Sequence, residues 1–123
     1  MKDDYEEKNA QIESTSLGGY DGGTSVMTCW LHLKYGGSGG QGFGGYGLDE
    51  PFHKGDKFAG RRGTAYGMEF ITRIIATVGV DRWEDLPGKY IRVRARHDKV
   101  LAIGNITEDR WFSPDDLKVL IPA

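Results

Sequence analysis

Alternation of apolar and polar residues predicts a β-hairpin near the start of the chain. Residues 24–35 alternate clearly, with the period of two that marks a strand buried on one face. The side chains expected to face the core are Met27, Cys29, Leu31 and Leu33. Residues 10–17 alternate more weakly, and the glycine pairs within residues 18–23 favour a turn between the two segments. We therefore expect two antiparallel strands here.

A helical period follows over residues 64–78. The apolar residues that recur on one helical face are Phe70, Ile71, Ile74, Ile75 and Val78. Thr64 is a suitable N-cap, and Gly79 is the residue type that most often ends a helix. Gly67 lies within the first turns, where glycine costs about 1 kcal/mol relative to alanine. A glycine at this position predicts that another segment packs closely against the helix.

Two more strands are expected in the C-terminal half. Residues 89–97 alternate between apolar side chains and arginines, and residues 100–106 are an apolar run. The resulting order is β-β-(β)-α-β-β, in which the bracketed strand covers residues 46–48. This order predicts an α+β fold, with a small antiparallel sheet of about four to five strands packed on one main helix. Residues 1–9 are expected to form a flexible acidic lead-in, and residues 10–123 a single domain.

The most unusual feature is a glycine-rich segment at residues 36–47, where eight of the twelve residues are glycine. It contains the pattern G-x-G-x-x-G, but the polar residues after it do not form the helix that a dinucleotide site requires. A P-loop is excluded because the segment has no Gly-Lys-Ser or Gly-Lys-Thr ending. We interpret the segment as a long loop.

This loop is the first candidate binding surface. Phe43 and Tyr46 either anchor the loop by packing on the sheet or present aromatic surface to a partner, and the pattern favours neither. The residues assigned to partner or ligand binding are Gly37, Ser38, Gln41, Phe43, Tyr46, Arg61 and Arg62. The two arginines precede the predicted helix, where guanidinium groups and free backbone amides suit an anion. The alternative for both arginines is an ordinary solvated loop, which we favour.

A second candidate surface is the arginine face of the strand at residues 89–97. Arg92, Arg94 and Arg96 share that face, and like charges at this spacing repel mildly. They need either acidic neighbours, such as Glu13, Glu69 or the acidic N-terminal residues, or an anionic partner such as nucleic acid. The net charge is −2, which provides no general attraction to nucleic acid. An ordinary exposed sheet face is therefore favoured.

The sequence contains no recognisable set of catalytic or metal-binding residues. The three histidines share no metal-ligand spacing, and the single cysteine, Cys29, excludes an intramolecular disulfide. We expect neither enzyme activity nor a cofactor. Trp30, Trp83 and Trp111 lie in apolar contexts and most simply supply the core, but partial exposure at an interface fits each of them as well, and the sequence does not separate the two. No apolar run is long enough to span a bilayer, which favours a cytoplasmic protein without membrane contact.

Three groups of residues together resemble a family of small proteins encoded by bacteriophages and prophages. The first group is LGGYDGG at residues 17–23 with TCWLHL at 28–33, and the second is YGGSGGQGFGGYGLD at 35–49. The third group is WEDLPGKYIRVR at 83–94 with AIGNI at 102–106 and WF at 111–112. The resemblance covers residues 11–112, and its most specific part is the glycine-rich segment. It implies a phage context and brings no catalytic residues.

The expected function follows from this context. Small phage proteins without an active site often act by binding a host component. We therefore expect a non-enzymatic accessory protein, in the host cytoplasm, that occludes a defence protein or protein–RNA complex as anti-CRISPR proteins do. One alternative is a sponge that binds a nucleotide signal through the glycine loop with Arg61 and Arg62. The other is a small nucleic-acid-binding module that uses Arg92, Arg94 and Arg96.

Overall fold

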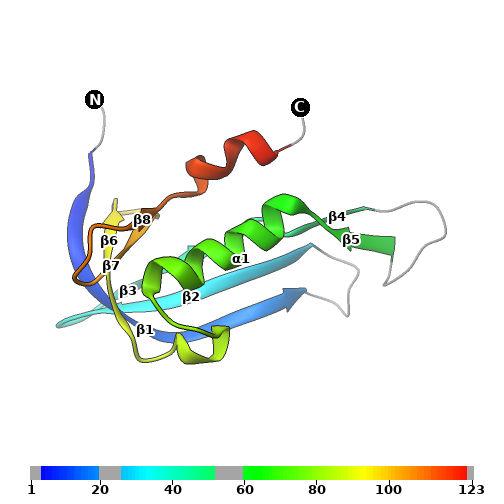
Figure 1. Cartoon of the computed structure of the whole chain (residues 1–123). Helices are drawn as coiled ribbons and strands as arrows, with labels where there is room; N and C mark the ends of the chain where they lie inside the picture. The colour runs from blue at the N-terminus through cyan, green and yellow to red at the C-terminus, as the bar shows by residue number, and fades with distance from the viewer. Residues whose placement is uncertain (1–3, 20–25, 52–59, 122–123) are drawn as a thin grey trace.

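The predicted hairpin is present, and its first strand is long. The computed structural model describes residues 4–19, 26–51 and 60–121 (Figure 1). Strand β1 (Glu6–Gly19) pairs antiparallel with β2 (Met27–Tyr35). Most of the turn expected between them lies outside the described residues.

The side of β2 that was expected to face the core does so. Cys29, Leu31 and Leu33 are at most 4% exposed, and Met27 packs against the core while remaining half-buried. The period of two therefore identified both the strand and its buried face, because one side of β2 meets the interior and the other meets solvent.

β1 lies between β2 and β6 (Tyr90–Ala95) in the sheet, and it bends in the middle. Its register with β2 shifts between Ile12 and Ser14, and such a bulge bends a strand and increases its twist. Before the bulge, β1 pairs with β6 instead of lying free. The prediction of a flexible lead-in is therefore wrong for residues 6–9. Their side chains are all exposed, so no apolar alternation marked them as a strand.

The main sheet has six antiparallel strands and is strongly curled. β3 (Gly40–Gly44), β7 (Val100–Asn105) and β8 (Trp111–Phe112) complete the order β3-β2-β1-β6-β7-β8. Although β3 and β8 are the two edges of the sheet, the rings of Phe43 and Phe112 meet edge to face with their centroids 6.2 Å apart. The two edges of the sheet therefore approach each other, and the concave side between them holds the core.

Helices cover this concave side. They are α1 (Ala65–Val78) and two short 3-10 helices, η3 (Trp83–Asp85) and η4 (Pro114–Leu120). Figure 1 shows α1 lying across the sheet, and η4 packs against it. Within the described ranges, no helix is both long enough and apolar enough to cross a membrane.

The predicted α+β class is confirmed, but the expected strand count is too low. The described residues form eight strands, because β4 (Asp49–Pro51) and β5 (Arg61–Gly63) pair in a separate two-stranded sheet. No strand forms at residues 46–48, where a short one was expected. The strands that were missed are short or rich in glycine, so they carry no hydrophobic alternation to reveal them.

The main helix forms where its period and caps predicted it. Thr64 Oγ accepts a hydrogen bond from Gly67 N (2.9 Å), and Gly79 ends the helix with a φ of 90°. Close packing at Gly67 is also confirmed, since a Cβ there would lie 2.1 Å from the Leu48 carbonyl oxygen. Phe70 of α1 completes the centre of the core, with its ring 5.8 Å from that of Phe43.

Candidate functional site

Five of the twelve residues of the glycine-rich segment form a strand, β3 (Gly40–Gly44), where a long loop was expected. In β3 every second residue is a glycine, and Gly40, Gly42 and Gly44 lie opposite the solvent-facing residues of β2. The residues between them, Gln41 and Phe43, lie opposite buried Leu33 and Leu31. The outer face of β3 therefore has no side chains, whereas its inner face contributes to the core.

Trp30 lies against this bare strand. A Cβ at Gly42 would come within 2.9 Å of the indole ring, and one at Gly45 within 2.4 Å. The ring can approach the backbone of the glycine-rich segment only because both positions lack a side chain. For Trp30 the sequence left the core and partial exposure open, and the structure shows partial exposure: the indole is half-buried on the outer side of the sheet.

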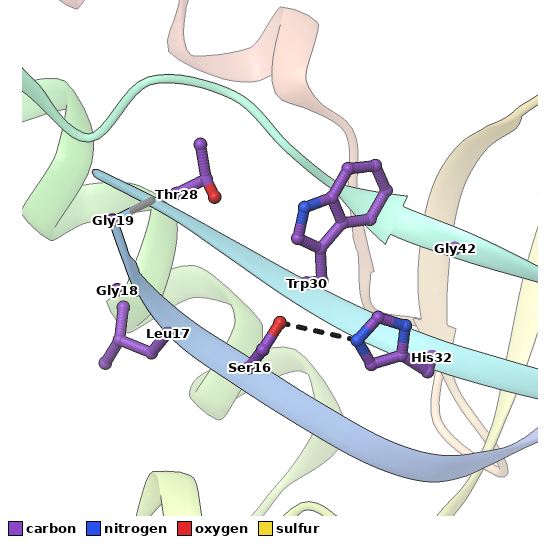
Figure 2. A pocket seen from close by; sticks show the side chains of 8 residues that line it. All are labelled: Ser16, Leu17, Gly18, Gly19, Thr28, Trp30, His32 and Gly42. Carbon is purple, nitrogen blue, oxygen red and sulfur yellow. Dashed lines mark hydrogen bonds between the residues drawn. The ribbon is translucent and has the colours of Figure 1, made fainter. Parts of the chain in front are cut away.

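A hollow of about 560 Å³ lies beside Trp30 on this outer face (Figure 2). It is lined by Ser16, Leu17, Gly18, Gly19, Thr28, Trp30, His32 and Gly42. The rings of Trp30 and His32 are stacked, with centroids 6.4 Å apart and planes 16° from parallel. A hydrogen bond of 3.3 Å between Ser16 Oγ and His32 Nε2 helps to fix the imidazole. The two rings therefore form a continuous aromatic ridge with hydroxyl groups at its side.

A second hollow, of about 440 Å³, lies on the other side of Trp30. It is lined by Trp30, Gln41, Gly42, Gly44, Tyr46, His97, Asp98, Lys99 and Val100. The turn between β6 and β7 is held at this hollow by Gln41, whose Nε2 donates to Arg96 O at 3.0 Å and His97 O at 3.3 Å. Trp30 and Gly42 thus border both hollows, and we call this surface the Trp30 face.

The residues predicted from the glycine segment have different positions. Phe43 is 1% exposed and Tyr46 packs on Phe70 with ring centroids 5.5 Å apart, which favours the anchoring role that had been left open for both. Gln41 is half-buried and accepts a hydrogen bond from the Tyr35 hydroxyl, so its side chain links β3 to the end of β2. Gly37 and Ser38 are exposed in the connection between β2 and β3. Of this set, Gln41 and Tyr46 border the second hollow.

The anion pocket predicted at the start of α1 does not take the expected form. The Arg61 guanidinium is held by Asp49, with Nε 3.0 Å from Oδ2, and both side chains are largely buried. Arg62 forms a more exposed pair with Glu50 at 2.9 Å. At the helix terminus, the Thr64 side chain already accepts from a backbone amide. The two arginines fasten β5 to β4 rather than lining a helix N-terminus together.

The arginine face of β6 is engaged by neighbouring groups. The Arg92 guanidinium lies 4.8 Å and that of Arg94 4.0 Å from the Trp111 ring centroid. Arg94 also pairs with Glu7 at 3.3 Å, which confirms the acidic N-terminal residues as one source of neutralisation. Arg96 lies 3.6 Å from Asp98. Trp111, for which the core and partial exposure were both open, covers Gly104 on the outer face, where a Cβ would lie 2.7 Å from its ring.

The titratable groups with displaced pKa values suit structural roles. Burial raises the pKa of the Cys29 thiol to about 12, so the thiol stays protonated at neutral pH and is a poor nucleophile. Burial also raises the pKa of the phenols of Tyr35 and Tyr66. Across residues 4–19, 26–51 and 60–121, no group of three or more His, Cys, Asp or Glu side chains is arranged to hold a metal ion.

The sequence carried a signal for the Trp30 face that the initial interpretation did not use. Glycine at positions 40, 42 and 44 repeats with a period of two, which is the period of a strand. A strand with glycine on one face leaves room for a large side chain from its neighbour. The alternation of β2 already placed Trp30 and His32 on the solvent side.

Comparison with known proteins adds no relative: no protein-family model, curated protein or solved structure matches the chain.

Proposed function

We propose that the protein is a non-enzymatic phage accessory protein that binds a host defence component and inhibits it by occlusion, in the manner of anti-CRISPR proteins. The Trp30 face is its contact surface, and the host cytoplasm is where it acts. The phage context rests on the resemblance of residues 11–112 to phage and prophage proteins. We propose the contact on the outer face of β2 beside the glycine segment, and the support for this choice is the half-exposed indole of Trp30.

The observation that carries the proposal is the aromatic ridge formed by Trp30 and His32. Aromatic side chains that are rigid and half-exposed are typical anchors of protein interfaces. Here the indole rests on glycine backbone, and the imidazole is tied to Ser16, so little side-chain freedom is left to lose on binding. A hollow on each side of the ridge leaves space for groups of a partner.

The contacts give less support to the two alternatives. A nucleotide sponge was expected to use Arg61 and Arg62 with the glycine loop. The Arg61 guanidinium is bound to Asp49, and Arg62 pairs with Glu50. A nucleic-acid module was expected to use Arg92, Arg94 and Arg96. The Arg92 guanidinium donates to Asn105 O and Glu108 O, and Arg94 and Arg96 pair with Glu7 and Asp98. Recruiting either set to an external phosphate would break these internal contacts. The Trp30 face requires no such rearrangement.

The test is protection of a phage from a defence system. Bacteria with an active CRISPR effector that targets a lytic phage would express the protein, its Trp30→Ala variant, or a control. Met68→Ala is the matched control, because Met68 is 66% exposed on α1, away from the outer face. We expect the native chain and Met68→Ala to restore plaque formation and Trp30→Ala to lose most of this protection.

Two outcomes would count against the proposal. If Trp30→Ala protects as well as the native chain at equal protein levels, the Trp30 face is not the contact surface. If the native chain protects against none of the defence systems of its host, inhibition of defence is not its function.

A further inference from the structure

We infer that the Trp30 face recognises an unpaired strand of RNA, whose bases stack on Trp30 and His32. The inference rests on the proposed function in one respect, since it takes this face as the contact surface. It goes further by naming the chemistry that the face reads, namely single-stranded RNA exposed in a host protein–RNA complex.

The first observation is the geometry of the two rings. Trp30 and His32 are two positions apart on the outer side of β2, with nearly parallel planes and centroids 6.4 Å apart. Single-stranded RNA is recognised by splayed bases that stack on aromatic side chains, often on neighbouring positions of a strand. Stacking on such rings tolerates any sequence, because every base has a π-face. The two rings provide places for two successive bases.

The second observation is the flat surroundings of the ridge. The β1 residues opposite Trp30 and His32 are Ser16 and Ser14, and the β3 residues opposite them are Gly44 and Gly42. All four are small, so no side chain longer than serine lies beside the two rings, and the indole itself covers the backbone at Gly42. A strand of RNA can lie along β2 without displacing a larger side chain.

The third observation is the positive charge beside the ridge formed by Trp30 and His32. Lys34 follows His32 on the outer side of β2, and it is exposed. Lys99 and His97 border the second hollow beside Trp30. The carboxylate in that hollow, Asp98, lies 3.6 Å from the guanidinium of Arg96 and is balanced by it. Lys34 and Lys99 therefore place positive charge at the end and at the side of the ridge, where the phosphates of a stacked strand would run.

The hydroxyl groups favour RNA over DNA as the occupant. Ser14, Ser16 and Thr28 lie beside the two rings, on the outer side of β1 and β2. The 2′-hydroxyl both donates and accepts hydrogen bonds, and it distinguishes RNA from DNA at a protein surface. A row of serine and threonine hydroxyls is complementary to it.

The experiment measures binding of fluorescein-labelled oligouridylate, about ten nucleotides long, to the full chain by fluorescence anisotropy. The matched deoxyribose strand and an RNA duplex are the other probes. We expect the unpaired RNA to bind most tightly, Trp30→Ala to weaken it about tenfold or more, and Trp30→Phe to restore part of the loss. Lys34→Ala should weaken binding modestly and reduce its dependence on salt.

The controls separate stacking from folding and from the proposed function. His32→Ala removes an exposed ring without touching the core, so a loss of binding in this variant cannot arise from a failure to fold. The inference is overturned if the native chain does not bind the RNA, if DNA binds equally well, or if both ring variants bind like the native chain. Loss of defence inhibition in Trp30→Ala without RNA binding would overturn this inference alone. RNA binding through Trp30 without any effect on defence would overturn only the proposed function.

Discussion

The side-chain amide of Asn105 donates a hydrogen bond of 3.1 Å to the backbone carbonyl of Thr77, in the last turn of α1. The same Nδ2 donates to Val78 O at 3.1 Å, and Oδ1 accepts from the amides of Thr107 and Glu108 at 3.0 and 2.9 Å. One buried side chain at the end of β7 thus caps the helix and shapes the turn that leads to β8. The C-terminal carbonyls of a helix lack partners within it, which is why such a cap is stabilising.

Replacing Asn105 should therefore destabilise the fold. Asn105→Ala leaves two helix carbonyls and two turn amides without this partner, and we expect the free energy of unfolding to fall by about 2–3 kcal/mol. Urea denaturation measures the change. Asn9→Ala is the control, because Asn9 is an exposed asparagine in β1, and it should change the stability by less than about 0.5 kcal/mol. Equal effects in both variants would contradict the capping role.

The sequence was sufficient for elements whose signal is local. Thr64 and Gly79 fixed the ends of α1, and the alternation of β2 identified its buried side, because caps and periodicity depend on near neighbours. The curl of the sheet was not predictable in this way. It depends on the bulge near Glu13 and on contact between Phe43 and Phe112, residues far apart in the chain. The position of Trp30 stayed open because a tryptophan in an apolar context fits both a core and a ridge that rests on glycine.

Gly67→Ala should destabilise the protein although alanine favours helices. On helix propensity alone the substitution would add about 1 kcal/mol of stability. The new Cβ would lie 2.1 Å from Leu48 O, so the helix or the Leu48 segment must shift, at a cost of about 1–3 kcal/mol. Thermal unfolding of the variant and of the native chain shows whether the substitution lowers or raises the stability. Gly63→Ala is the control because its Cβ would meet nothing within 4 Å; a higher melting temperature for Gly67→Ala would refute the close contact.

Gly104→Ala should disturb the stack between Arg92 and Trp111. Gly104 pairs with Arg92 on one side and with Trp111 on the other, so the guanidinium and the indole meet above it. A Cβ would lie 2.7 Å from the indole, and we expect a loss of about 1–3 kcal/mol of stability. A double-mutant cycle checks the cause: the penalty should shrink when Trp111 is already alanine. If Gly104→Ala costs the same stability in the absence of the indole, the loss arises from the backbone at Gly104 and not from contact with Trp111.

Stability should fall at alkaline pH through Cys29. In the unfolded chain this thiol loses its proton near its ordinary pKa of 9.0, whereas burial raises its pKa in the folded chain to about 12. Between these values the folded state binds the additional proton, so the free energy of unfolding decreases as pH rises from about 9 to about 12. The raised phenol pKa values of Tyr35 and Tyr66 act in the same direction.

The contribution of Cys29 can be isolated by comparison with Cys29→Ala. Urea denaturation of both chains at several pH values above 9 should show a smaller decrease in the variant, whatever its stability at neutral pH. Parallel curves for the two chains would contradict the raised pKa of the thiol.

The division of β1 between two partners also has a consequence for the order of folding. Its second half pairs with β2, only a short distance along the chain, whereas its first half must wait for β6. The first half of β1 and its partner are far apart in the sequence: Gln11 Nε2 donates a hydrogen bond to Gly88 O, 77 positions away. Contacts between distant segments carry a large loop-closure entropy and tend to form slowly. We therefore expect the meander of β1, β2 and β3 to assemble early, with the ridge of Trp30 and His32 already in place. The closure of the curled sheet, which brings the β6–β7 turn to the second hollow, is then the late step that limits the folding rate.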